Sequence, residues 1–472
     1  MNDYAPTTAF TAETAVASVD ASSTSLLTDM YELTMLQGAL ASGTATRRSV
    51  FELFGRRLPA SRRFGVVAGT GRLLDAIEAF AFTPSQIDFL HRTGVVNDET
   101  LDFLRDYRFT GTVRGYAEGE CYFAGSPLLT VEGTFAEACI LETLALSIYN
   151  YDCAVASAAS RMTIAAHGRP CVDFGARRAH EQAAVAAARA SVVGGFVGTS
   201  NLEAGLLYGI PTVGTSAHSF TLLHDSEEDA FAAQVASLGP STTILVDTYD
   251  IATGVERAVK AARAAGGELG AVRLDSGDLV AEAFKVRAQL DTLGATSTKI
   301  TVTNDLDEHA IAALGAAPVD SYGVGTKLVT GSGRPTAALV YKLVEREGAD
   351  GTMEEVAKFS SGGKSTVGGR KWAGRRLTSE GTAAEELVVS SSSQDQGLAA
   401  LSEAGARPLQ VLLVDEGRII EEHRGKEALS AAAERHRASR AELPYDAWRL
   451  SDGESALPTR HIDIDGRSAT RR

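Results

Sequence analysis

Six short β-rich runs between Cys171 and Thr326 each end in residues that could bind or react with an anionic substrate. In chain order they read CVDFGARR, PTVGTSAHS, TILVDTYD, AVRLDSGD, KITVTND and VDSYGVGT. Ala-rich helical stretches such as GVERAVKAARAAGG lie between them. Short apolar strands that alternate with helices predict a parallel sheet covered on both faces. Because β/α barrels carry their sites at the carboxyl ends of the strands, we expect these residues to meet there.

The run VRLDSGDL combines a cation with carboxylates at the start of a helix. Arg273 ends the expected strand, and Asp275 and Asp278 follow it. Carboxylates there could bind ribose hydroxyls or Mg²⁺, and the amides of a helix N-terminus attract phosphate. The plain alternative is that Ser276 or Asp278 caps the helix. Capping does not explain an arginine beside the carboxylate, so the pattern favours a binding site.

His218 stands in PTVGTSAHSF, where small residues such as Gly214 and Thr215 surround it. An accessible imidazole beside phosphate-type sites can act as a general base, a metal ligand or a phosphoryl acceptor. The ordinary alternative is a histidine that serves only the core. The nearest other histidine, His224, lies six residues on and beyond the loop. Metal ligation is therefore the least favoured of the three roles.

Two further runs carry weaker patterns. In DFGARRAHE, Phe174 could stack on an aromatic ring and Arg177 could pair with a carboxylate or phosphate. A core phenylalanine and a surface helix start explain the same residues. In SYGVGTKL, Gly325 and Thr326 could bring backbone amides close to a phosphate. A tight strand-to-helix turn explains this run equally well.

Two segments have the spacing of a capping box. Ser200 precedes Glu203 by three residues in GTSNLEAG, and Asp29 precedes Glu32 around Tyr31 in TDMYELTM. This spacing predicts a capped helix start, and a capped start that faces the edge of the sheet would also be an anion site. A tyrosine in the first turn of an amphipathic helix is more often a core residue than a ligand.

The composition restricts the class of protein. The 472 residues carry a net charge of −15, which disfavours nucleic acid or an anionic membrane as the main partner. The four cysteines lie 14 to 18 residues apart without a C-x-x-C pair, which favours buried thiols in a reducing cytoplasm. The first 25 residues contain no Lys or Arg and no apolar segment, so they do not resemble a secretory signal. The apolar stretch ACILETLALSIY is too short to span a bilayer.

These observations predict an α/β protein with an irregular β/α barrel and a smaller flanking α/β domain built from both chain ends. The expected segments are a disordered tail (1–25), the N-terminal part of the flanking domain (26–135), the barrel (136–335), the C-terminal part of the flanking domain (336–440) and a loose tail (441–472).

Seven signatures, in this order, closely resemble the nicotinate phosphoribosyltransferase family: LLTDMYELTM, FGARRAH, GFVGTSNLEAG, GTSAHS, VDTYD, VRLDSGDL and GVGTKL. The stretch KFSSGGKSTVGGRKWAGR, 358–375, is similar to the family's later Lys- and Gly-rich segment. The resemblance implies a type II phosphoribosyltransferase-like barrel in a cytoplasmic homodimer with sites at the interface. It also implies nicotinate and phosphoribosyl pyrophosphate as substrates, Mg²⁺ as cofactor and ATP as a co-substrate hydrolysed through a phosphohistidine.

The resemblance also implies roles for individual residues. His218 would be the phosphohistidine, and Asp275 would take part in catalysis and be the candidate protein ligand of a Mg²⁺ held mainly by pyrophosphate. The substrate-binding residues would be Tyr31, Thr215 and Arg273 for nicotinate, Phe174 stacking on its ring, Arg177 for phosphate, Ser200 for the choice of pyridine, and Gly325 and Thr326 for the ribose phosphate.

Three other functions stay open at this point. A nicotinamide-using relative would have the same fold, but such relatives carry an aspartate at the place of Ser200. A quinolinate phosphoribosyltransferase would need several basic residues for two carboxylates and no phosphohistidine. An inactive binding homologue is disfavoured by the presence of His218, Arg273 and Asp275.

Overall fold

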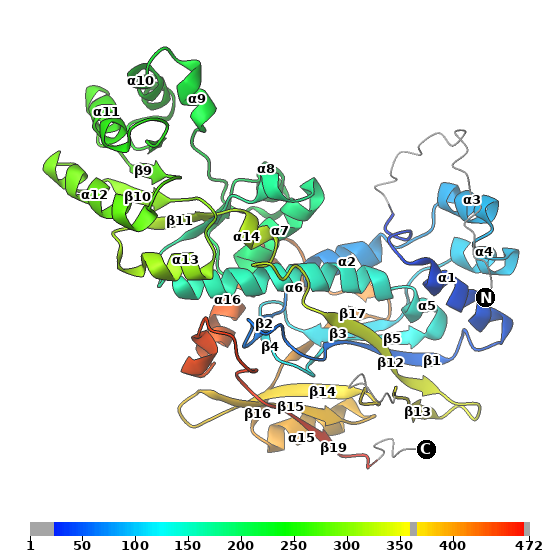
Figure 1. Ribbon diagram of the computed structural model, residues 1–472. Coiled ribbons are helices and arrows are strands. Elements are labelled where there is room, and N and C mark those ends of the chain that lie inside the picture. Colours follow the sequence, from blue (N-terminus) through cyan, green and yellow to red (C-terminus); the bar gives the residue numbers. More distant parts are fainter. Residues whose placement is uncertain (1–22, 359–365, 467–472) are drawn as a thin grey trace, which may run out of the picture.

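The computed structural model describes residues 23–358 and 366–466, which form three main β-sheets with helices around them (Figure 1). The expected tail 1–25 lies outside the described residues apart from its last three, of which Ser25 is buried and donates a hydrogen bond to Gln86. Part of the Lys- and Gly-rich segment, 359–365, also lies outside them.

The predicted parallel sheet is present and curls into a half-barrel. Its six strands all run parallel, with apolar residues such as Val272, Ile300 and Val324 fully buried. Such strands need helices on both faces to exclude water. In sheet order the strands are β7 (Gly198–Thr199), β6 (Cys171–Asp173), β11 (Ser321–Val324), β10 (Lys299–Val302), β9 (Ala271–Leu274) and β8 (Thr243–Leu245).

The helices of this region follow the strands as the alternating pattern predicts, which confirms the irregular β/α barrel. Small side chains such as Ala187, Ala258 and Ala283 let them pack closely on the sheet. They are α7 (Glu181–Val193), α8 (Leu202–Tyr208), α9 (His218–Leu223), α10 (Glu227–Leu238), α11 (Ile251–Ala264), α12 (Leu279–Thr292), α13 (Glu308–Ala313) and α14 (Thr326–Val329), with the 3₁₀ turns η1 (Ala176–Arg178) and η2 (Leu314–Ala316).

One expected strand, in PTVGTSAHS, is wrong. Only Thr212 makes an isolated bridge, to Thr199, and the sixth strand is β7 instead. Two backbone bonds hold this segment: Thr199 donates to the carbonyl of Pro211, and Val213 donates to the carbonyl of Thr199. Pro211 has no N–H to extend the ladder. The chain therefore leaves the sheet after Val213 and runs as a loop to His218.

The seven-stranded sheet is antiparallel and contains strands from both chain ends. Phe51 of β1 stacks on Tyr341 of β12 with ring centroids 5.0 Å apart. In sheet order the strands are β13 (Met353–Glu355), β12 (Leu339–Glu347), β1 (Arg48–Gly55), β5 (Pro127–Thr134), β3 (Thr112–Tyr116), β17 (Gln410–Asp415) and β18 (Arg418–Ile419). Helices α1 (Met30–Ala41), α2 (Thr70–Glu78), α3 (Pro84–Thr93), α4 (Asp98–Arg105) and α5 (Phe135–Cys139), and the pair β2 (Gly65–Val66) and β4 (Cys121–Tyr122), complete this region.

Helix α6 (Glu142–Ala165) joins the two main hydrophobic cores. Its first half, including Ile148 and Tyr149, packs in the core of the seven-stranded sheet, while Val155 and Met162 pack in the core of the half-barrel. Figure 1 shows it crossing between the two regions. Within the described residues, no helix has the length and apolar character needed to cross a membrane.

The third sheet shows that the expected loose tail 441–472 is wrong for part of its length. Strand β19 (Thr459–Asp463) runs parallel to β15 (Ala383–Ser390), and Leu457 just before it is buried. The strand lies at the sheet edge, where Arg460 pairs with Glu385 at 3.0 Å and Ile462 packs on the core of this sheet. Its polar sequence gives no strand pattern. The other two strands of this sheet are β16 (Ala406–Pro408) and β14 (Lys371–Leu377). The helical elements of the C-terminal part of the chain are α15 (Gln394–Glu403), η3 (Glu421–His423), α16 (Gly425–Ala441) and η4 (Tyr445–Trp448).

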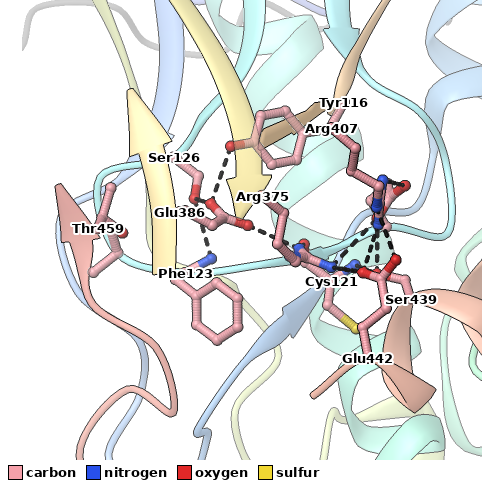
Figure 2. Close-up of polar contacts among 12 residues, drawn as sticks. Tyr116, Cys121, Phe123, Ser126, Arg375, Glu386, Arg407, Ser439, Glu442 and Thr459 are labelled. Atoms are coloured by element: carbon pink, nitrogen blue, oxygen red, sulfur yellow. Dashed lines mark hydrogen bonds and ion pairs between the residues drawn. The ribbon is translucent and has the colours of Figure 1, made fainter. Parts of the chain in front are cut away.

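A buried ionic network fastens the third sheet to the rest of the chain (Figure 2). Arg375 of β14 pairs with Glu386 of β15 at 2.8 Å and with Glu442, just after α16, at 3.0 Å. Glu386 also accepts a hydrogen bond from Tyr116 of β3, and Arg407 pairs with Glu442 at 2.7 Å. Breaking such a buried pair costs about 3–5 kcal/mol, because a charge is left without its partner. The network therefore fixes the sheet and α16 relative to one another.

Candidate active site

A cavity of ≈ 340 Å³ lies at the carboxyl ends of the half-barrel strands. This is the edge at which the sequence predicts the site. Eight of the predicted site residues line it: Phe174, Arg177, Ser200, Thr215, Arg273, Asp275, Gly325 and Thr326. Two others, His218 and Tyr31, are not among its lining residues.

The ring of Phe174 is held at the end of β6 by its neighbours. A Cβ atom at Gly323 would lie 2.6 Å from the Phe174 ring, so only glycine leaves room for the ring there. Beneath it the buried Asp173 accepts hydrogen bonds from the amide of Gly175 and the hydroxyl of Thr199, both at 2.7 Å. Burial raises the pKa of Asp173. The turn that carries Phe174 is thus fixed before any ligand arrives.

Arg273 has the features of an anion-binding residue. It lies at the end of β9, and its guanidinium donates to the hydroxyl of Thr215 at 3.1 Å. Its Nε is buried and lacks a hydrogen-bond partner, and within the described residues it has no carboxylate at ion-pair distance. Burial lowers the pKa of Arg273, while the charges of Asp275 and Asp247 oppose that shift. A ligand carboxylate would supply the missing partner.

Asp275 is oriented by hydrogen bonds from two neighbouring strands. The hydroxyl of Thr303 donates to its carboxylate. Its own backbone amide donates to Asp247 at 2.9 Å, and the hydroxyl of Ser276 donates to the same Asp247 oxygen at 2.6 Å. Asp278 caps α12 through the amide of Ala281, as the capping alternative predicts. The free side of Asp275 faces the cavity.

His218 lies beside the cavity as the first residue of α9. Its side chain is 41% exposed, its Nδ1 lies 3.1 Å from the hydroxyl of Thr248, and its Nε2 lies 3.9 Å from Asp247. The adjacent Ser216 and Ala217 line the cavity. Asp247 therefore stands between His218 on one side and the backbone of Asp275 on the other. The sequence signature VDTYD contains Asp247, but the sequence alone gave it no role.

The helix after Ser200 is capped differently from the expectation. The cap of α8 is Asn201, whose side chain accepts from the amide of Ala204 at 3.0 Å. Ser200 instead donates its amide to the carbonyl of Asp173 at 2.8 Å, which ties it to β6. At the second predicted capping box, the side chain of Asp29 makes no capping hydrogen bond to the start of α1. Glu32 instead accepts hydrogen bonds from Thr28 and Thr143. Ser200 still lines the cavity.

Three lining residues absent from the predicted site follow β10, namely Thr303, Asn304 and Asp305. Asn304 and Asp305 both have positive φ angles, of 90° and 42°. Such values cost free energy for residues other than glycine and cluster at functional sites. Asn304 and Asp305 are the last two residues of the run KITVTND, and this polar end of a β-rich run was the sequence feature that could have indicated them. Arg177 and Arg178 are exposed across the mouth, so cations and carboxylates both line the cavity.

Tyr31 is not brought to the cavity of its own chain. It is 44% exposed on α1, which Figure 1 shows at the side of the molecule, well away from α9. Burial by its surroundings, and next the charge of Glu142, raise the pKa of Tyr31 to about 12, so the hydroxyl stays protonated. It could serve as a hydrogen-bond donor to another molecule.

The residues present fit a magnesium ion that is coordinated mainly by water and by the phosphates of the substrate. Across the described part of the chain, no three His, Cys, Asp or Glu side chains converge on a metal-binding position. Mg²⁺ characteristically keeps water and takes one or two carboxylates together with substrate phosphates. Asp275 offers such a carboxylate, and the buried Oδ1 of Asp247 has no hydrogen-bond partner.

The curled sheet and the cavity at its carboxyl edge define a type II phosphoribosyltransferase-like enzyme. The crystal structure of human nicotinic acid phosphoribosyltransferase superposes with a TM-score of 0.78 at 25% sequence identity. The match covers 92% of this chain and 97% of the human one.

The chain belongs to the nicotinate phosphoribosyltransferase family. Residues 26–150 match the nicotinate phosphoribosyltransferase N-terminal domain, and residues 170–361 match the nicotinate phosphoribosyltransferase family. The nicotinate phosphoribosyltransferase pncB1 of Mycobacterium tuberculosis is 52% identical over 445 residues, covering 93% of this chain and 95% of that protein. The Bacillus subtilis nicotinate phosphoribosyltransferase is 38% identical and covers 74% of this chain and 72% of its own length.

Proposed function

We propose that this enzyme joins nicotinate to the phosphoribosyl group of phosphoribosyl pyrophosphate and releases pyrophosphate, and that it hydrolyses ATP through a phosphohistidine at His218. The product is nicotinate mononucleotide, which would return nicotinate to NAD by salvage in the cytoplasm. The observation that carries this proposal is Arg273, which lines the cavity with Phe174. Its buried Nε has no hydrogen-bond partner, and among the described residues it makes no ion pair.

The pyridine ring would lie between Phe174 and Arg273. Aromatic rings stack on one another with a preferred offset, and a guanidinium binds a carboxylate through two parallel hydrogen bonds. Thr215, which already accepts from Arg273, would fix the angle of the guanidinium. These contacts would hold the ring nitrogen toward the sugar, which is the main contribution required when the nucleophile needs no activation.

The sugar and its phosphates would occupy the side of the cavity formed by Gly325, Thr326 and Arg177. Loss of pyrophosphate from the anomeric carbon passes through a state with positive charge on the sugar, as in glycoside cleavage. Asp275, oriented by Thr303, would stabilise that charge. Bound Mg²⁺ would neutralise the departing pyrophosphate.

ATP would transfer its γ-phosphoryl group to a ring nitrogen of His218, releasing ADP. Water would later hydrolyse the phosphoimidazole and release phosphate. The exposed imidazole follows a loop of small residues, which leaves space for the phosphate to approach in line. Asp247, on the side of Nε2, would orient the ring and balance its positive charge.

The phosphohistidine is tested with ATP labelled in the γ-phosphate. We expect an acid-labile, base-stable label on the wild-type protein and none on His218→Ala. His224→Ala is the matched control, because the His224 ring contacts the carbonyl and the ring of Phe220 and does not line the cavity, so labelling should stay intact. Label that persists in His218→Ala would overturn this assignment.

The reaction itself is tested by product formation from radiolabelled nicotinate and phosphoribosyl pyrophosphate, with and without ATP. We expect nicotinate mononucleotide, formed faster with ATP, and little product from labelled nicotinamide. A preference for nicotinamide would mean that the cavity serves the other pyridine, and no product from either would favour an inactive homologue.

A further inference from the structure

Two further cavities lie at the opposite edge of the half-barrel sheet. They measure ≈ 380 and ≈ 310 Å³ and share Thr163, Gly168 and Arg440. Pro170 and Val197, which precede β6 and β7, line the second of them. The strand β6 separates Pro170 from Phe174, a distance of about 13 Å at 3.3 Å per residue. The two cavities form one cleft, which we call the rear cleft.

The rear cleft has an aromatic end that water reaches. Tyr445 is 80% exposed and Trp448 is 38% exposed, and their ring centroids lie 5.8 Å apart. Both stand on η4, which follows α16, and Figure 1 shows α16 below α6, on the side away from α9. Large exposed aromatic side chains that line a cavity offer a stacking surface for a planar ring. Nothing in the transferase chemistry uses them.

The other end of the rear cleft is cationic. Arg169 and Arg437 line it, and Arg440 lines both cavities, while Arg449 lies in the cavity of Tyr445 and Trp448. Among the described residues that form the two cavities there is no Asp or Glu. Arg440 donates only to neutral oxygens, those of Thr163 at 2.9 Å and Ser160 at 3.4 Å. In a chain of net charge −15, four arginines without an acidic lining residue are an unusual concentration of positive charge.

The arginines differ in how much freedom they have to bind a ligand. Arg169 is held by two backbone carbonyls and Tyr322, and Arg449 pairs with Asp446 at 2.7 Å. Arg437 is exposed and has no ion pair within the part of the chain that is described. Burial lowers the pKa of Arg440, and the nearby charge of Arg437 lowers it too. An anion between Arg437 and Arg440 would relieve that repulsion.

We propose that the rear cleft binds a nucleoside phosphate, with the base on Tyr445 and Trp448 and the phosphate on Arg437 and Arg440. The ligand class follows from the two ends of the cleft, because a planar ring and an anionic group must be present in one molecule. Arginine forks bind phosphate oxygens in pairs, which suits this end of the cleft. The site is separate from the transferase cavity and does not depend on the reaction catalysed there.

The chain provides its own reporter for the rear cleft. It has two tryptophans, and Trp372 is buried with its indole N–H bonded to the carbonyl of Ser391. AMP stacked on Trp448 should therefore quench the protein's fluorescence through one residue. We expect saturable quenching by AMP in the presence of saturating nicotinate, with weaker effects from adenosine alone or from inorganic phosphate alone.

Substitutions place the binding at the cleft. Arg437→Ala should weaken AMP binding by at least about tenfold, because a charge-assisted hydrogen bond to the phosphate is lost. Arg92→Ala, an exposed arginine on α3, is the matched control and should bind as the wild type does. Arg177→Ala, at the transferase cavity, should also leave the quenching unchanged. Absence of saturable quenching, equal binding by Arg437→Ala, or loss of binding in Arg177→Ala would overturn the proposal.

Discussion

At the scale of single residues, Arg273 shows most clearly how a half-buried cation can indicate a missing ligand. It is enclosed at the end of β9 with one neutral hydrogen-bond partner, Thr215. Its guanidinium keeps an unsatisfied buried Nε. Burying a charge without a partner is costly, and a folded protein tolerates it where a ligand later supplies the partner. The position of Phe174 in the same cavity points to an aromatic carboxylate.

Replacing Arg273 with alanine should therefore affect one substrate. Loss of the partner of a buried carboxylate costs about 2–5 kcal/mol, so the KM for nicotinate should rise by a factor of about 30 or more. The KM for ATP should change little, because His218 and its contacts remain. Steady-state kinetics with each substrate varied in turn measures both. Equal effects on the two substrates would give Arg273 a structural role only.

Ser200 tests the choice between the two pyridines. It lines the cavity and is tied to Asp173 through its backbone amide, so its side chain can be changed without breaking that bond. An aspartate there would set a carboxylate against the carboxylate of nicotinate, a repulsion that lowers affinity for the charged pyridine. Ser200→Asp should depress nicotinate use by at least about tenfold, or 1.4 kcal/mol. Ser200→Thr is the control, and unchanged nicotinate kinetics in Ser200→Asp would place selectivity elsewhere.

The sequence predicted the lining residues better than the residues that hold them. The β-rich runs end at or near Phe174, Arg273 and Asp275. Their place at one edge of the sheet follows from the alternation of short strands and helices along the chain. The role of Asp247 depends on bonds to an amide 28 residues away, made when β8 and β9 pair side by side. Asp173 is similar, because its contact with Thr199 spans 26 residues. Spacing along one chain does not show such pairing.

At the scale of elements, long periodic segments were predicted well and short ones were not. The Ala-rich segments became α10, α11 and α12, because a repeated apolar face fixes a helix over several turns. The segment 211–217 has β-branched residues but too few backbone bonds to stay in the sheet. The capping box at Ser200 was wrong because the backbone of Ser200 pairs with β6, which moves the helix start by one residue.

One element-scale contact makes stability depend on pH. His436 of α16 is buried, and its Nδ1 donates to the carbonyl of Gly119 while Nε2 lies 2.9 Å from the hydroxyl of Ser160. Burial lowers the pKa of His436 to about 3, with the charge of Arg440 acting the same way. The unfolded chain binds a proton below about pH 6.5 and the folded one does not. The free energy of unfolding should therefore fall as pH drops from about 6.5 toward 3.

Denaturant unfolding across this range measures the effect. One such group contributes a slope of up to about 1.4 kcal/mol per pH unit. His436→Gln should be less stable than the wild type at neutral pH but should lose less stability on acidification. The difference between the two slopes isolates His436 from the many carboxylates that also titrate. Parallel slopes would mean that the histidine is not the titrating group.

At the scale of the whole molecule, apolar side chains are exposed on two surfaces that the expected homodimer could bring together. Around the transferase cavity, α8 and α9 expose Leu202 at 76%, Leu206 at 71% and Leu223 at 78%. On the distant α1, Met30 and Tyr31 are exposed as well. Grouped apolar side chains of this kind mark protein–protein contacts. A homodimer with α1 of one subunit against α8 and α9 of the other would cover both surfaces and bring Tyr31 to the partner's cavity.

Mixing two impaired variants, assayed at a low nicotinate concentration, tests this arrangement. Tyr31→Ala and Arg273→Ala subunits, unfolded together and refolded, should form mixed dimers in which one of the two sites has both native residues. Random pairing makes about half of the dimers mixed, so about a quarter of the sites should recover. Mixing Phe174→Ala with Arg273→Ala is the control, because both residues line one chain's cavity and no site can be restored. Light scattering verifies that the species is a dimer. Recovery in the first mixture but not in the second places Tyr31 in the partner's site, and no recovery in a verified mixed dimer would remove Tyr31 from nicotinate binding across the interface.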